Sequence, residues 1–362
     1  MRTIATPLFA GDLHHTALRL AQAQPSGASA DATAAWRHML ELGWQGVLVD
    51  EESGGAGAEL ADFAAIVEAL ATRALSVPII ERCAVAPALL GACDGAVARA
   101  LLERVARGDA SVAPVLHTAP QHPAAQPPTV RGDRLSGTVA AVDWTVPATH
   151  VVFDALENTS DAPLLVLLDV AELSSHLRCY VGIDGRTSAD IEVAELRVDA
   201  PQLLLRGAPA ARAIARAQQL GSMLGCVATV GACGAMIEQT VEHLSTRVQF
   251  GSPLATFQAL RHRVVDMYVA YESARGLVRD QVLAHAHAPD PRQVALTRFY
   301  VQGVGRSLAD ATIQLHGGMG MSQETLAARL AMHALMSALR YGDRSDCLEW
   351  LVSGVVEEVA AA

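Results

Sequence analysis

Two short motifs in the C-terminal half of this chain carry side chains suited to binding an anionic ligand. The first runs Arg-Val-Gln-Phe-Gly, from Arg247 through Phe250 to Gly251, and Gln258 follows it. A guanidinium presents a planar fork of donors that holds a pair of phosphate oxygens better than an ammonium does. An arginine near the end of a helix is, however, often only a solvated partner of the helix dipole, so Arg247 by itself does not identify a site.

The second motif, Gln-Leu-His-Gly-Gly-Met-Gly, begins at Gln314 and ends a helical pattern. Gly317 can serve as the C-terminal cap of that helix, and together with Gly318 it lets a ligand approach the backbone closely. The Gln314 amide offers both a donor and an acceptor. His316 has no His or Cys at metal-ligand spacing, so we expect it to be structural and expect no metal site.

Long helical patterns carry both motifs. Pro209 suits the first turn of a helix, and Pro253 interrupts the pattern after Arg247. Four helices are expected, over residues 210–247, 257–287, 291–314 and 322–339. Because short loops join them, residues 206–362 predict a C-terminal antiparallel four-helix bundle.

Residues 1–110 predict a helical N-terminal domain, because Ala, Leu, Arg and Glu are strong helix formers. Asp31 is a candidate N-cap. Residues 42–49 predict a short strand or extended run. The glycines of 51–57 predict a turn rather than a dinucleotide-binding loop, because the G-x-G-x-x-G spacing is absent. The expected helices cover residues 18–23, 31–42, 60–75, 83–90 and 97–106.

Short β-type runs fill residues 111–205 and predict a central β domain of barrel-like or sandwich type. The four prolines of 119–128 exclude a helix there, and a hairpin is expected around Gly132-Asp133. Too many short strands follow one another for a βαβ crossover fold. Further strands are expected at 150–153, 164–168, 178–181 and 191–198. The fold class is therefore α+β with several domains.

Composition limits the classes of function. The net charge of -11 and the pI of about 5.6 argue against a nucleic-acid binder, whose footprint is basic, and suit a soluble cytoplasmic protein. The six cysteines include no C-x-x-C pair, so we expect them to be reduced. The sequence shows no N-terminal signal pattern and no apolar run of about eighteen residues that could span a membrane.

Taken together, these features resemble the acyl-CoA dehydrogenase family over nearly the whole chain. The resemblance rests on the two C-terminal motifs, the central β domain, and the stretch Leu-Gly-Trp-Gln-Gly from Leu42, with Glu51, Glu52 and Gly54-Gly55 behind it. It implies FAD, a homo- or heterotetramer, and α,β-desaturation of an acyl-CoA thioester. In that reaction a glutamate takes the α-proton and hydride goes to the flavin. The resemblance also implies an electron-transfer flavoprotein as electron acceptor.

The residues at the family's base position depart from this pattern. The Tyr-Glu-Gly-Thr-like motif of the family falls on Arg340-Tyr341-Gly342-Asp343, so Tyr341 stands where the glutamate would be. A tyrosine with a pKa of about 10 is a poor base near neutral pH. Asp343 is the candidate for a displaced base, because the family's alternative position, at residues 220–223 here, has no carboxylate.

The central domain departs as well. Residues 117–123 replace the family's Thr-Glu-Pro loop, and residues 142–147 are at best a match to its Trp-Ile-Thr-like strand. Trp144 and Thr145 are therefore candidate flavin contacts. Alternatively, Trp144 is a half-buried residue of the sheet.

The kept and lost residues together favour a companion subunit. In the family, the Arg and Gln-Gly-Gly motifs reach across a dimer interface to the FAD of the neighbouring subunit, whereas the base and the β-domain loops serve a subunit's own flavin. The cofactor-binding residues kept here are Arg247, Phe250, Gln258, Gln314, Gly317 and Gly318. We therefore expect a heterotetramer with a paralogous catalytic subunit, as in family members that act on bulky substrates such as steroid side chains. Two alternatives stay open: a self-sufficient dehydrogenase with Asp343 as its base, and a non-enzymatic scaffold that binds acyl-CoA or protein.

Overall fold

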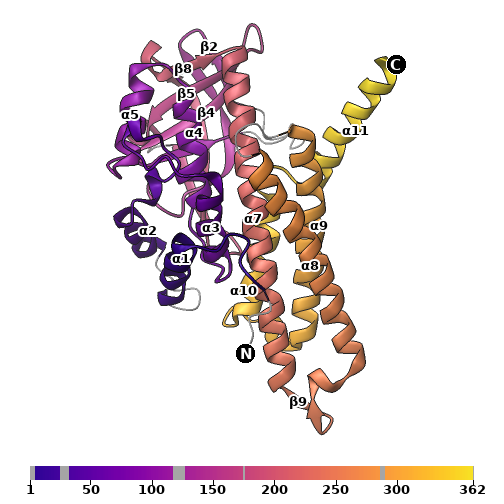
Figure 1. Ribbon diagram of the computed structural model, residues 1–362. Helices are drawn as coiled ribbons and strands as arrows, with labels where there is room; N and C mark the ends of the chain where they lie inside the picture. Colours follow the sequence, from indigo (N-terminus) through magenta and orange to yellow (C-terminus); the bar gives the residue numbers. More distant parts are fainter. Residues whose placement is uncertain (1–4, 25–31, 117–126, 174–175, 286–289, 362) are drawn as a thin grey trace. The chain divides into compact units, whose positions relative to one another are not determined.

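The structure is a computed structural model that describes residues 5–24, 32–116, 127–173, 176–285 and 290–361 (Figure 1). Its contacts divide the chain into two compact units that alternate along the sequence. The first contains Met1–Asp31, Leu60–Leu75 and Ser222–Ala362, and the second contains Ala32–Glu59 and Ser76–Gly221. The three-domain division, with boundaries at residues 110 and 205, stays a prediction.

Long helices make up the first unit, and they confirm the predicted C-terminal bundle (Figure 1). Helix α9 packs against α8, α10 and α11, and α1 packs against α3. The final helix, α11, was not predicted. The helices of this unit are α1 (Asp12–Ala23), α3 (Leu60–Ala71), α7 (Ala208–Thr246, which enters the unit at Ser222), α8 (Gln258–His285), α9 (Pro291–His316), α10 (Leu326–Leu339) and α11 (Arg344–Ala361).

Small residues let α7 approach its neighbours closely. A Cβ added at Gly231 would lie 2.8 Å from the carbonyl oxygen of Glu68 on α3, and one added at Gly305 of α9 would lie 2.7 Å from the Thr229 methyl on α7. Helix axes can come this close only where a side chain is missing. The Ala- and Gly-rich composition of this helix therefore sets the spacing of the bundle.

Among the described residues, α7 is the one helix that could cross a membrane by length and composition alone. This helix is long enough, and its most apolar window has a mean hydropathy of 1.8. That window is 94% buried inside the structure, however, as in the core helix of a globular bundle.

Two helix ends show how the sequence sets the boundaries. Gly317 ends α9 with φ 60°, which confirms the expected glycine cap. Helix α10 begins at Leu326 rather than at residue 322, because the Thr325 hydroxyl accepts a hydrogen bond from the Ala328 N–H and caps it.

The second unit contains the shorter helical elements. The predicted extended run at 42–49 is wrong, because Gly43 (φ 74°) opens a 3-10 turn, η1 (Trp44–Gly46), in which Trp44 is buried. The turn packs tightly, since a Cβ on Gly46 would lie 2.9 Å from the Ala106 carbonyl oxygen. The other elements are α2 (Ala32–Glu41), η2 (Glu51–Ser53), the π-helical turn η3 (Glu81–Val85), α4 (Ala86–Gly91) and α5 (Ala96–Ala106). The predicted N-cap, Asp31, lies outside the described residues.

The predicted central β domain is confirmed as one mixed sheet with strand order β6-β7-β3-β2-β4-β5-β8, and with β1 parallel to β4. The predicted hairpin is β2 with β3. Strands β1 and β8 were not predicted. The strands are β1 (Val112–Val115), β2 (Thr129–Arg131), β3 (Arg134–Asp143), β4 (His150–Glu157), β5 (Pro163–Asp169), β6 (Leu177–Val181), β7 (Thr187–Arg197) and β8 (Leu203–Arg206). Most of the proline-rich segment, residues 117–126, lies outside the described residues.

One face of this sheet carries an apolar core. Leu135, Val151, Phe153, Val166 and Ile191 are all fully buried in it. Two short helical turns flank the final strands: α6 (Val170–Leu173) and η5 (Ala200–Gln202).

Candidate functional site

The Arg247 motif forms an exposed hairpin at the end of α7. Strands β9 (Val248–Gln249) and β10 (Ser252–Pro253) pair across a two-residue turn, in which Phe250 and Gly251 have φ values of 56° and 82°. Positive φ at both central residues is the signature of a tight hairpin turn. The Phe250 ring is 91% exposed and meets the Phe257 ring edge-on at 6.0 Å. The turn therefore presents an aromatic side chain to its surroundings rather than burying it.

The Gln314 motif also faces outward. Gln314, Gly317 and Gly318 are exposed, and a Cβ added at either of these glycines would meet nothing within 4 Å. Gly320 differs, because a Cβ there would lie 2.5 Å from the Ile313 carbonyl oxygen. The fold thus requires glycine at position 320 and, through its positive φ, at 317. No described residue of this chain requires glycine at 318, so the open backbone there is available to another molecule.

A pair of stacked histidines brings the two motifs together. His243 lies four residues before Arg247, and His316 directly precedes Gly317; their rings stack at 4.5 Å and 27°. The His316 Nδ1 lies 2.8 Å from the Thr312 carbonyl oxygen, which can only accept, so this nitrogen carries the proton. Burial, then the charges of His316 and Arg247, lower the pKa of His243. His316 is thus structural, as expected, and it fixes both motifs at the same end of the bundle.

Several polar groups remain exposed at this end. The Arg247 guanidinium is exposed, and no carboxylate pairs with it among the residues that the structure describes. Gln258, the first residue of α8, is exposed as well. With Gln314 they give this end of the bundle one exposed guanidinium and two exposed primary amides, and the open backbone of Gly318 belongs to the same motif as Gln314. This donor set suits a ligand that carries phosphates and a heterocyclic base.

Asp343 and Tyr341 lie in the connection between α10 and α11. One carboxylate oxygen of Asp343 accepts hydrogen bonds from the N–H groups of Ser345 (2.7 Å) and Asp346 (3.0 Å). In return, the Asp346 carboxylate accepts a bond from the Asp343 N–H at 2.6 Å. This reciprocal pair is a capping arrangement that starts α11. The Asp343 side chain is therefore bound to its own backbone, which weakens it as a candidate base.

Tyr341 is half-buried and has a φ of 61°, and Gly342, which follows it, has a φ of 95°. A left-handed conformation is uncommon for a tyrosine and persists only where the surrounding structure imposes it. The segment predicted to occupy the position of the base motif is thus a tight, specific turn.

Sequence reasoning missed the residues that hold this turn, Arg298 and Gln302 of α9. Arg298 is only 4% exposed; its Nη1 donates to the Ser222 hydroxyl at 2.9 Å, and its Nη2 donates to the carbonyl oxygens of Ala338, Arg340 and Gly342. Gln302, one helical turn later, donates to the carbonyl oxygens of Ala338 (2.6 Å) and Gly342 (3.1 Å). One sequence feature could have identified Arg298: it is a charged residue on the apolar face of α9, in line with Val294 and Val301.

Trp144 and Thr145 follow β3 in the other unit. The backbone N–H of Trp144 donates to the Thr187 carbonyl at 2.9 Å. Its ring is half-buried against the core of the sheet, with the Arg82 guanidinium 5.9 Å from its centre. The Thr145 N–H donates to the Asp143 carboxylate at 3.0 Å. Both residues therefore have contacts within the second unit, and a flavin contact stays a prediction.

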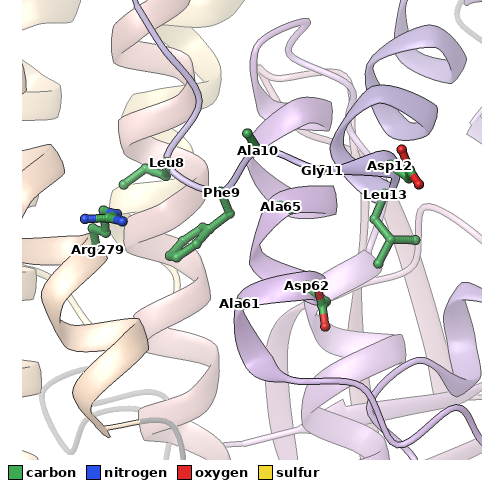
Figure 2. A pocket seen from close by; sticks show the side chains of 10 residues that line it. All are labelled: Leu8, Phe9, Ala10, Gly11, Asp12, Leu13, Ala61, Asp62, Ala65 and Arg279. Carbon is green, nitrogen blue, oxygen red and sulfur yellow. The ribbon is translucent and has the colours of Figure 1, made fainter.

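A groove separate from these residues lies along the N-terminal segment (Figure 2). Figure 2 shows Asp12 and Asp62 near one end and Arg279 near the other. The lining consists of residues 8–13 with Ala61, Asp62, Ala65 and Arg279. None of the predicted site residues lies in it.

The buried carboxylate of Glu68 holds the same segment. Its oxygens accept the Leu8 N–H at 2.8 and 2.9 Å, and Arg275 donates to the Thr6 hydroxyl and the Pro7 carbonyl. Burial outweighs these hydrogen bonds and raises the pKa of Glu68 to about 7. No group of three or more potential metal ligands gathers among the described residues.

Comparisons with known proteins support the resemblance. Family models described as the N-terminal and C-terminal domains of acyl-CoA dehydrogenase match residues 16–109 and 211–344. The acyl-CoA dehydrogenase IpdE2 of Mycobacterium tuberculosis is 30% identical over 325 residues, covering 90% of this chain and 86% of that protein.

Solved structures agree with these sequence matches in fold. The butyryl-CoA dehydrogenase of Megasphaera elsdenii superposes with a TM-score of 0.84 at 19% identity, over 96% of this chain and 99% of that one. A steroid ACAD described as Tcur3481-Tcur3483 gives 0.83 at 22% identity, over 97% and 98%. The two matched domains, the full-length relative and the shared fold together place this chain in the acyl-CoA dehydrogenase family.

Proposed function

We propose that this chain is the companion subunit of a heteromeric acyl-CoA dehydrogenase. The family is that of oxidoreductases acting on acyl-CoA. In the proposed assembly, a paralogous catalytic subunit supplies the base and holds the flavin ring. The residues that this chain lends across the interface are Arg247, Phe250, Gln258, Gln314, Gly317 and Gly318.

The observation that carries this proposal is the contrast between two ends of the α9 helix. At its C-terminal end, the donors around the His243–His316 stack are exposed and leave an open backbone. Near its start, Arg298 and Gln302 hold the segment that aligns with the family's base motif, where Tyr341 replaces a carboxylate and Asp343 serves as a helix cap. The chain is thus equipped to bind a ligand outside itself and lacks an evident base of its own.

The residues present fit the dinucleotide part of FAD. Arg247 would hold the pyrophosphate, because its guanidinium is exposed and unpaired with any described carboxylate. Gln258 and Gln314 would bind toward the adenosine end, and Gly318 would let it approach the backbone. When bound, FAD supplies the hydride acceptor for α,β-desaturation. Trp144 and Thr145 would be flavin contacts only if this chain also held a flavin ring itself.

The name of one structural neighbour is that of a two-chain assembly, which supports the proposal. The described fold matches a structure named as the ChsE4-ChsE5 complex of Mycobacterium tuberculosis, with a TM-score of 0.82 at 19% identity. That name, and the steroid ACAD noted above, support a bulky acyl-CoA of steroid or fatty-acid type as substrate. We further propose a cytoplasmic location and an electron-transfer flavoprotein as acceptor, both by family resemblance.

Co-expression with a paralogous dehydrogenase chain tests the proposal. The co-purified complex should contain FAD and should oxidise acyl-CoA, and Arg247→Met should lower its FAD content. Arg306→Met is the matched control, because Arg306 is an exposed arginine on the same bundle, away from either motif. FAD content that Arg247→Met leaves unchanged would contradict the proposed contact. Full activity of Asp343-dependent homotetramers would instead support the self-sufficient alternative.

A further inference from the structure

Arg298 is a buried cation whose partners are all neutral. Its hydrogen bonds go to the Ser222 hydroxyl and to backbone carbonyls, and no ion pair joins it to a carboxylate among the described residues. Taking a guanidinium out of water is costly unless its donors are well satisfied. A long apolar side chain would fill the same space with no such cost, so the donors of Arg298 need an explanation.

The accepting carbonyls explain the requirement for charge. Ala338 and Arg340 lie at the C-terminal end of α10, where the last carbonyls have no partner within the helix and carry the negative end of its dipole. Gly342 lies two residues further on. Arg298 and Gln302 both donate to Ala338 and to Gly342. Each end of the turn is therefore held by two side chains of α9.

The turn is fixed from its other side as well. The Asp343–Asp346 capping pair sets the start of α11 at Arg344, two residues after Gly342. Between these anchors lies Tyr341, with a φ of 61°. A tyrosine keeps such a conformation only when its neighbours over-determine it, and Arg298, Gln302 and the capping pair provide that constraint.

We infer that Arg298 is a positioning residue, which holds residues 338–342 by their carbonyls and thereby fixes where the Tyr341 ring is presented. In the proposed assembly the base lies on the paralogous subunit, so the inference concerns the conformation of this turn and goes beyond the proposed function. The positioning itself does not depend on that function. Arg298 touches neither substrate nor cofactor in this account and acts through Tyr341.

Fluorine NMR of the chain labelled with 3-fluorotyrosine measures the positioning directly. The sequence has five tyrosines, and Tyr341→Phe identifies the signal of Tyr341 by its loss. Arg298→Met should shift or broaden that signal and leave the other four in place. Non-denaturing guanidinium should restore it, because the free cation can refill the site. Arg306→Met, on the same helix, should change nothing.

Arg298→Lys is the second variant, for the case that Arg298→Met does not fold. An ammonium is a point donor and cannot match the fork that reaches Ser222 and three carbonyls, so the Tyr341 signal should move partway. A Tyr341 signal that stays in place in both variants would overturn the inference.

Discussion

Asp343 and Tyr341 are two residues apart, yet the structure gives them different surroundings. The Asp343 carboxylate binds two N–H groups of α11, whereas Tyr341 occupies a left-handed turn held by Arg298. Alignment with a motif could locate both residues. It could not show that one of them is a helix cap, because a cap is defined by which N–H groups its oxygens reach.

Substitutions at Asp343 separate capping from catalysis. Asparagine caps a helix about as well as aspartate, whereas alanine costs about 1 kcal/mol. We therefore expect Asp343→Asn to keep both stability and turnover, and Asp343→Ala to lower the free energy of unfolding by about 1 kcal/mol. Denaturant unfolding and acyl-CoA oxidation by the co-expressed enzyme check this. Loss of turnover in Asp343→Asn with flavin still bound would restore Asp343 as the base.

The two glycines of the second motif offer a matched pair of substitutions. Gly318→Ala adds a methyl group into open space, so stability should change by less than about 0.5 kcal/mol. Gly320→Ala places a Cβ 2.5 Å from the Ile313 carbonyl oxygen and should cost about 1–3 kcal/mol.

The effects of the two substitutions on flavin binding should be in the opposite order, with the larger effect at Gly318. If the open backbone at Gly318 receives the adenosine end of FAD, Gly318→Ala should lower flavin retention in the co-expressed complex without lowering the melting temperature. Equal retention in Gly318→Ala and the unaltered chain would remove this glycine from the proposed site.

At the scale of elements, the periodicity of apolar residues predicts the long helices. It does not predict the elements whose backbones pack closely against each other at glycines. Residues 42–49 predict an extended run, yet Gly43 turns the chain and Gly46 lies against Ala106. Strands β1 and β8 were missed because each is only four residues long and is recognised by its pairing.

Helix α11 could have been found from the Asp343–Asp346 spacing. Arg298 could not be assigned a role, because its acceptors lie about 40 residues later in the chain and become visible only in the fold.

The N-terminal segment should show a pH-dependent stability through Glu68. Folding raises the pKa of this carboxyl from 4.5 to about 7. Its favourable contribution is therefore complete below pH 4.5 and is lost as the pH rises toward 7, by about 3 kcal/mol in total.

Glu68→Gln removes this titration and keeps an oxygen that can accept the Leu8 N–H. Relative to the unaltered chain, the variant should gain stability as the pH rises from 5 to 8, as measured by urea unfolding at several pH values. The control is Glu238→Gln, which changes a half-buried carboxylate that binds the Ala5 N–H in the same segment. A difference between Glu68→Gln and the unaltered chain that does not vary with pH would contradict this account.

At the scale of the whole molecule, the family and its fold are established, and the question is where the flavin resides. The exposed donors around Arg247 and Gly318 belong to one end of the bundle and face outward. The backbone N–H groups of Trp144 and Thr145 donate to the Thr187 carbonyl and the Asp143 carboxylate within the other unit. In the proposed function this chain binds one part of the FAD, and a second subunit supplies the rest of the site.

The visible absorbance spectrum of the chain expressed and purified alone tests this claim most directly. The account predicts a colourless protein that acquires a flavin band on co-purification with a paralogous partner, with FAD at half occupancy per chain. A flavin band of one FAD per chain in the protein expressed alone would contradict it and would identify a self-sufficient dehydrogenase.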